Sequence, residues 1–290
     1  MILSLAMLLA QQTETGWLPA VRVVVASTLL ASLWCIESYF TRASHRGDKL
    51  RHGLRNLTLA VFNACVLYLP IGLTTLAILS YTDRQSWGFV PWAADSRVIR
   101  FVIAFLLLDL WSYAWHLTNH RMRWLWRFHR VHHSDCAMDV TTAARFHVGE
   151  MAMAAVVRLP FLFLLGVSVA DLVIYETALV TTSLLHHSAI HLGAVDPVLR
   201  LLIATPDMHR IHHSRREVES SSNYGSVLSV WDRLFASYRP EPIRPASCGL
   251  DQFDRQDRQS LAGMLKTPLD PMDPEEAGPA VAAGRSPSTQ

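Results

Sequence analysis

Residues 101–133 read FVIAFLLLDLWSYAWHLTNHRMRWLWRFHRVHH, and they join a long apolar run directly to five histidines. The apolar run, Val98–Trp115, approaches the ~20 residues that a membrane-spanning helix needs. Positions i, i+3 and i+4 lie on one side of a helix, so each histidine cluster is expected to point its imidazoles toward one place. The stretch therefore predicts a membrane helix that leads into a metal site, with the clusters His116-x3-His120 and His129-x2-His132-His133.

Two further clusters bring the number of grouped histidines to ten of the chain's 14. Neutral imidazole is the commonest metal ligand, and one zinc ion takes about four ligands, so ten histidines indicate two metals. In the third cluster, whether His186 or His187 is the ligand stays open, although the spacing to His191 favours His187. Thr205 and Pro206 predict a helix start just before the fourth cluster. These clusters are His187-x3-His191 and His209-x2-His212-His213.

Polar residues near the clusters are candidates for supporting roles. Asp109 and Tyr113 share a helical face with His116 and His120, and an ionisable residue inside a span indicates function. Asp109 is too far along the helix for the same metal, so we expect it to orient a histidine from another helix. A buried polar pair that serves only packing is the alternative. The isolated His147 is expected either to support a ligand, to face a substrate or to be structural.

The overall composition is that of a membrane protein. Apolar residues make up 51% of the chain and charged residues 17%, and the mean hydropathy is +0.21. The formal net charge of +2 comes from basic residues in two local groups, which does not indicate nucleic-acid binding. The four cysteines have no regular spacing, so neither a disulfide framework nor a zinc site of thiolates is expected.

Four apolar regions set the predicted topology. Trp17–Phe40, Leu57–Ser80 and Val98–Trp115 are expected to span the membrane, and Met151–Leu185 is expected to form a hairpin of two helices. The positive-inside rule places the basic loop 41–56 and the basic segment 121–130 in the cytoplasm, together with all four histidine clusters. The opening MILSLAMLLA is too short to span and lacks the features of a cleaved signal peptide.

The predicted fold is all-α, a multi-pass membrane helix bundle with a histidine-rich helical catalytic cap on the cytoplasmic side. Three regions are expected. Residues 1–56 form a spanning helix and basic loop, 57–238 form the membrane and histidine-cluster domain, and 239–290 form a polar tail. The composition of the tail predicts disorder from about residue 268.

The ligand types restrict the chemistry. No carboxylate-rich cluster for magnesium or calcium exists, and imidazole suits zinc, copper, iron and nickel. Zinc hydrolysis would need a base as in H-E-x-x-H, which does not occur. The apolar setting favours a lipid substrate. Non-catalytic metal handling, haem binding and a structural zinc module remain alternatives, but haem would leave most of the histidines unexplained.

The clusters and their flanking residues resemble those of the fatty acid hydroxylase/sterol desaturase superfamily of membrane di-iron enzymes. The resemblance rests on four segments: Asp109-Leu-Trp-Ser-Tyr-Ala-Trp-His116, Leu125-Trp126-x2-His129-Arg-Val-His132-His133-Ser134, Thr205-Pro-x-Met-His209-Arg-x-His212-His213, and Asn223-Tyr-Gly225 followed by Trp231-Asp-Arg-Leu-Phe235. The metal-ligand role carries over to all ten clustered histidines, His116, His120, His129, His132, His133, His187, His191, His209, His212 and His213. Arg145 and Asn223 are expected beside the metals or the substrate, as are Asp109, Tyr113 and His147.

The resemblance also implies an activity and its partners. It implies two iron ions, for which zinc can substitute in purified protein, and O2-dependent hydroxylation, desaturation or ether cleavage of a fatty acyl, sterol or alkylglycerol-like lipid. No appended cytochrome b5-like segment is found, so electrons are expected from a separate ferredoxin or cytochrome b5 type protein with an NAD(P)H reductase. The expected location is the bacterial inner membrane.

Overall fold

The structure, a computed structural model, describes residues 17–40, 46–242 and 247–272. The described residues are helical, with isolated bridges between extended residues in place of a sheet. The longer helices are α2 (Leu18–Phe40), α3 (Arg46–Arg84), α5 (Arg97–Arg121), α6 (Arg123–His133), α7 (Val148–Leu165) and α8 (Val169–His187). The shorter α-helices are α4 (Phe89–Ala93), α9 (Asp196–Leu199), α10 (Pro206–His212), α11 (Glu217–Ser220), α12 (Val230–Leu234) and α13 (Leu261–Lys266). The 3-10 turns are η2 (Val140–Ala144), η3 (Gly193–Val195), η4 (Asp251–Phe253) and η5 (Thr267–Leu269).

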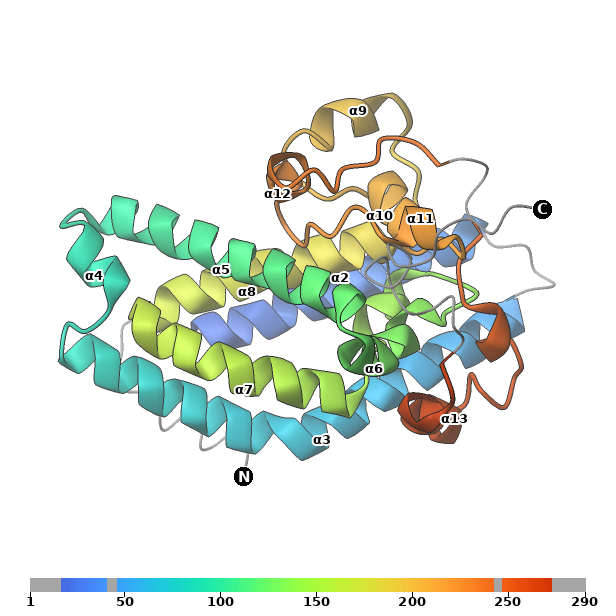
Figure 1. Cartoon of the computed structure of the whole chain (residues 1–290), viewed down its shortest axis with the longest axis horizontal. Helices are drawn as coiled ribbons and strands as arrows, with labels where there is room; N and C mark the ends of the chain where they lie inside the picture. Colours follow the sequence, from blue (N-terminus) through green and yellow to red (C-terminus); the bar gives the residue numbers. More distant parts are fainter. Residues whose placement is uncertain (1–16, 41–45, 243–246, 273–290) are drawn as a thin grey trace, which may run out of the picture.

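Four helical stretches are long and apolar enough to cross a membrane: Leu18–Tyr39, Asp48–Ala93, Arg97–Arg121 and Val148–Leu165. They run side by side in Figure 1, and large apolar side chains such as Val24, Val61 and Val156 lie exposed on them. Such apolar surface is far more extensive than a soluble monomer exposes. The predicted multi-pass helical bundle is confirmed.

The predicted hairpin is present as α7 and α8. The helices are separated at Gly166, whose φ of 64° is the left-handed conformation that ends many helices. Ser168 then caps α8 by accepting a hydrogen bond from the backbone amide of Asp171. Leu162, Leu165 and Tyr175 of the hairpin pack with Leu108 of α5 in the largest buried apolar cluster. The hairpin therefore fixes α8 beside the helix that carries the first histidines.

Helix α3 is longer than the sequence predicted. It begins at Arg46 rather than near Leu57, so Lys49, Arg51 and Arg55 lie on a helix and not in a loop. The extension is stable because it packs against η2, where Asn56 is fully buried and donates to Thr141 Oγ1 (3.0 Å). Just beyond the extension, Leu59 is fully buried with Val131 and Met264. Such tertiary packing outweighs local loop-like composition.

The cap consists of α6, η2, α10 and the segments after α10, gathered at one end of the long helices (Figure 1). The tail takes part in it. Arg130 of α6 is fully buried, and its Nη2 donates to the backbone oxygens of Thr267 (2.7 Å) and Asp270 (2.8 Å). Thr267 and Asp270 are thus held against α6, whereas 273–290 and the N-terminal MILSLAMLLA lie outside the described residues.

Candidate metal centre

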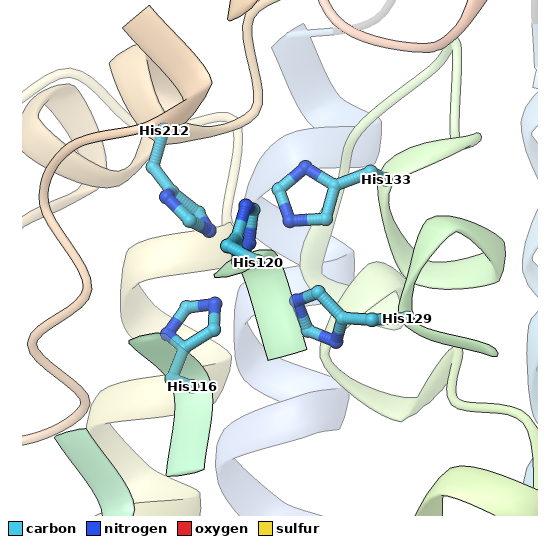
Figure 2. Close-up of side chains that lie close together, drawn as sticks. All are labelled: His116, His120, His129, His133 and His212. Carbon is cyan, nitrogen blue, oxygen red and sulfur yellow. The ribbon is translucent and has the colours of Figure 1, made fainter. Parts of the chain in front are cut away.

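Nine histidines of the cap and the adjoining helix ends form two groups, in each of which the nearest ring nitrogens all lie within 4.8 Å of one another. Helices α5, α6 and α10 supply the first group, and α6, α8 and α10 supply the second. Figure 2 shows the rings of the first group turned toward a common centre. The first group is His116, His120, His129, His133 and His212, and the second is His132, His187, His209 and His213.

In the first group, all five Nε2 atoms are buried without a hydrogen-bond partner. The Nδ1 atoms of two of these rings face backbone oxygens, for His116 that of Tyr224 (2.9 Å) and for His212 that of Ser222 (2.7 Å). A carbonyl oxygen only accepts, so Nδ1 must carry the proton and Nε2 must present a lone pair. Buried acceptors without a donor are costly, and a metal ion at their common centre would satisfy them.

The second group leads to the same conclusion by a different contact. The Nδ1 atoms of His132 and His187 face the backbone oxygens of Arg145 (3.3 Å) and Ser183 (2.8 Å), which puts a lone pair on each Nε2. These two Nε2 atoms lie only 3.0 Å apart. Two acceptors cannot hydrogen-bond to each other, whereas ligands ~2.1 Å from one shared ion are separated by roughly this distance. The donor set of each group therefore fits a metal ion.

The electrostatics keep the cap histidines in the form that binds metal. Burial, together with neighbouring imidazoles, lowers the pKa of each well below the ordinary value. The rings are then neutral at pH 7, as a metal ligand requires. The statement applies to His132, His133, His209, His212 and His213.

The structure divides the two H-x-x-H-H clusters between the groups. On α6, His129 and His133 belong to the first group and His132 to the second. The expectation that each cluster points at one place was wrong, because adjacent residues on a helix are about 100° apart. Only the i, i+4 pair shares a direction closely, and the third histidine turns to the other group.

The third cluster is brought to the site only in part. His187 joins the second group, but the His191 side chain is 70% exposed and its Nδ1 lies 2.6 Å from Asp207 Oδ1. The reason is that α8 ends at His187, so the i, i+4 relation to His191 is lost. His186 is buried with its ring 3.9 Å from that of His209, yet it belongs to neither group.

Asp109 supports the site through the backbone, and none of the hydrogen bonds that it accepts within the described residues comes from a histidine. It accepts hydrogen bonds from the Leu228 amide (3.0 Å) and from Trp231 Nε1 (2.8 Å). It thus ties α5 to the segment that begins with Tyr224, whose oxygen holds His116. Tyr113 of the same face bonds through its hydroxyl to Ser237 (2.8 Å). The direct contact with a histidine that the sequence suggested is not formed.

The other predicted supporting residues hold the backbone around the ligands. Arg145 is fully buried and donates to the Val131 oxygen (2.8 Å), while its own oxygen faces His132. His147 accepts from the Gly149 amide and caps α7, without contacting a histidine of either group. Asn223 adopts a positive φ of 58° and donates to the backbone oxygen of Met208 (3.1 Å).

Glu150 is a residue that the sequence analysis missed. Its Oε1 lies 2.8 Å from Nδ1 of His129 and 3.3 Å from Nδ2 of Asn119. A carboxylate behind a ligating histidine fixes the ring and raises its basicity. The available signal was an acidic residue directly before the predicted apolar region Met151–Leu185, three positions after His147.

His52 is a second residue that the sequence analysis did not single out. Its Nε2 lies 2.8 Å from Oδ1 of the fully buried Asp135, which also accepts from Thr142 Oγ1 (2.8 Å). Burial opposes the charged form, yet His52 and Arg145 hold the pKa of Asp135 well below its usual range. This polar network connects α3 to the segment between the ligands of α6 and Arg145.

A glutamate of the first span, Glu37, binds chain segments that border the second histidine group. Oε1 of Glu37 accepts from the amides of Ala189 (2.7 Å) and Val140 (3.1 Å), and Oε2 accepts from Lys49 Nζ (2.7 Å). Ala189 follows His187 by two residues, and Val140 begins η2. Helix α2 therefore fixes two of the chain segments that border this group.

Fold and site together define an all-helical membrane protein with two groups of buried histidines suited to metal ions. The fatty acid hydroxylase family profile matches residues 101–237, which include every histidine of both groups. Over this part of its length the chain is similar to the fatty acid hydroxylase family.

Curated relatives are consistent with this similarity. An alkylglycerol monooxygenase from Danio rerio is 33% identical over 48% of this chain and 30% of its own length. An ornithine lipid hydroxylase from Rhizobium tropici is 29% identical over 75% of this chain and 68% of its own length. The chain thus spans less than a third of the first relative and about two thirds of the second. No solved structure matches the chain.

Proposed function

We propose that this protein is a membrane-bound, non-haem di-iron oxygenase that uses O2 to hydroxylate or desaturate a lipid. The observation that carries the proposal is the convergence of buried, unprotonated imidazole nitrogens in two adjacent groups. The names of the relatives, an alkylglycerol monooxygenase and an ornithine lipid hydroxylase, support a lipid substrate. Fatty acyl, sterol and alkylglycerol-like lipids are the candidate classes.

Each histidine group would hold one iron ion. Iron bound there would supply O2 activation, with electrons delivered by a separate ferredoxin or cytochrome b5 type protein. The chain's own residues hold the imidazoles neutral, fix their rings through Nδ1 and keep the second group dry, with His132, His187 and His209 at most 3% exposed. The two groups adjoin, because the rings of His133 and His213 stack with centroids 4.4 Å apart.

We further propose that the cap faces the cytoplasm from the inner membrane of a bacterium. The support is the basic character of the two described segments on the cap side of the spans, residues 46–55 and 121–130. The segment at the opposite end, 81–97, carries two acidic and two basic residues, without the excess of basic residues found on the cap side, and is the expected external loop.

The test combines metal analysis with product analysis. Protein purified without oxygen is expected to contain about two iron ions per chain. With a reductase system, O2 and extracted membrane lipids, it should form a hydroxylated or desaturated lipid, and hydroxylation should incorporate oxygen-18 from labelled O2. His132→Ala should lose metal and activity. The matched control is His191→Ala, which removes an exposed histidine outside both groups and should retain both metals.

Two results would contradict the proposal. A fully active His132→Ala protein would exclude the second group from the reaction. Wild-type protein with two bound metals but no O2-dependent change in any lipid would favour the alternative, a metal-handling protein without catalysis.

A further inference from the structure

Three charged residues meet between apolar helices, away from the histidines. Glu176 of α8 pairs with Arg22 of α2 and with Arg158 of α7, the latter at 2.9 Å between Nη1 and Oε1. The Arg158 guanidinium also lies over the ring of Trp111, 5.7 Å from its centroid. Ionisable residues in membrane helices are rare and mark binding sites or pathways. The triad therefore requires an explanation beyond packing.

The charges of the triad do not balance. Two guanidinium groups share one carboxylate, which leaves one positive charge in excess. Nη2 of Arg158 is buried and has no hydrogen-bond partner. A guanidinium presents a planar fork that suits a carboxylate or a phosphate, so the donor without a partner matches an anionic group of this kind.

A cavity of about 430 Å³ opens beside the triad, and apart from Ser27 its remaining lining is aliphatic. A second cavity of about 340 Å³ shares Ser27 with it and is lined by apolar side chains that include Leu30, Trp34 and Leu54. The lining residues on α2 run from Arg22 to Trp34, and α2 lies alongside α8 in Figure 1. The two cavities thus have a cationic end and an apolar end.

We propose that these cavities bind a membrane lipid, with its acidic group between Arg22 and Arg158 and an acyl chain along α2 toward Trp34. The acidic group is a phosphate or a carboxylate, since both match the guanidinium fork. Glu176 precedes His187 by 11 residues on α8, so the site lies roughly 16 Å along that helix from the second histidine group. Lipid binding here does not require the metals and is independent of the proposed oxygenase activity.

The test measures lipid retention by the full chain in nanodiscs, with phosphatidylglycerol, oleate and zwitterionic phosphatidylcholine as probes. Wild-type protein should retain an anionic probe over phosphatidylcholine in native mass spectrometry. Arg22→Gln and Arg158→Gln should each weaken that preference about tenfold, because each removes a charged hydrogen-bond donor. Stronger retention of phosphatidylglycerol identifies a phosphate site, and stronger retention of oleate identifies a carboxylate site.

Glu176→Gln distinguishes lipid binding from a merely structural triad. It releases both arginines from their carboxylate, so retention of the anionic probe should increase. A structural triad would instead be damaged by all three changes in the same direction, and that result would overturn the proposal, as would equal retention of all three lipids by the wild type. Arg100→Gln is the matched control, since Arg100 binds the backbone oxygens of Ala94 and Pro91 outside the cavity. Unchanged metal content in every variant shows that the fold is intact.

Discussion

Removing the Glu37 carboxylate should empty the second histidine group while leaving the first one filled. Glu37 lies on α2, outside the segment that matches the family, yet it accepts hydrogen bonds from the amides of Ala189 and Val140. These segments adjoin His187 and lead to Arg145, whose oxygen faces His132. The ligands of the first group come from α5, α6 and α10. Ala189, Val140 and Lys49, which donate hydrogen bonds to Glu37, lie outside these helices.

The size of the effect follows from the two amide bonds. A hydrogen bond to a charged group contributes about 1.5–3 kcal/mol, so Glu37→Ala removes roughly 3–6 kcal/mol of local support. Loss of a partner behind a metal ligand typically weakens metal binding about 10- to 100-fold. We therefore expect a loss of that order in the affinity of the second group. Glu37→Gln keeps an acceptor oxygen but loses the Lys49 ion pair, so it should lie between the wild type and Glu37→Ala.

The assay is metal content per chain after dialysis against a graded series of chelator concentrations. Wild-type protein should release both metals over the same range of chelator concentrations. Glu37→Ala should fall to about one metal per chain at a much lower chelator concentration. Glu241→Ala, which removes an exposed carboxylate elsewhere, is the control. Retention of both metals at wild-type affinity, or equal weakening of both, would refute the assignment of Glu37 to the second group.

Two other perturbations have defined outcomes. Glu150→Ala removes the carboxylate 2.8 Å from His129 Nδ1 and should weaken metal binding by the first group about 10- to 100-fold, as measured by the same chelator series. Unaltered metal binding would show that Glu150 does not orient the His129 ring. In cells, a membrane-impermeant thiol reagent should leave the exposed Cys136 of the cap unlabelled until the membrane is opened. A cysteine introduced by Gln85→Cys, at the opposite end of the spans, should be labelled in intact cells. The reverse pattern would show that the proposed orientation is inverted.

The sequence predicted the helices and most of the histidine site because both depend on local pattern. Apolar length gave the spans and the α7–α8 hairpin, and close spacing gave the clusters that the structure brings together. The supporting residues depend on contacts between distant segments. Glu37 reaches Ala189 across 152 positions and His52 reaches Asp135 across 83, and no periodicity encodes such pairings. His191 was misplaced for a local reason, since its i, i+4 relation to His187 requires a helix that continues past His187, and α8 ends there.

The division of the two H-x-x-H-H clusters explains why the centre should bind two metals rather than one. On α6 the i, i+4 pair belongs to the first group and the intervening His132 to the second. On α10 the assignment is reversed, because His209 and His213 belong to the second group and His212 to the first. Each of the two H-x-x-H-H clusters thus contributes a pair of histidines to one group and a single histidine to the other. This exchange between the clusters requires two separate metal centres between the helices.

This exchange gives a reciprocal prediction for two single variants. His212→Ala should weaken the first group, and His132→Ala should weaken the second, although each residue is adjacent in sequence to a ligand of the other group. The second group should suffer more, because it retains three imidazoles, whereas the first retains four. Titration of the metal-free variants with cobalt(II), followed by its visible absorption, separates the two sites. If both variants lost the same site, the histidines would surround one centre, and the binuclear arrangement would have to be abandoned.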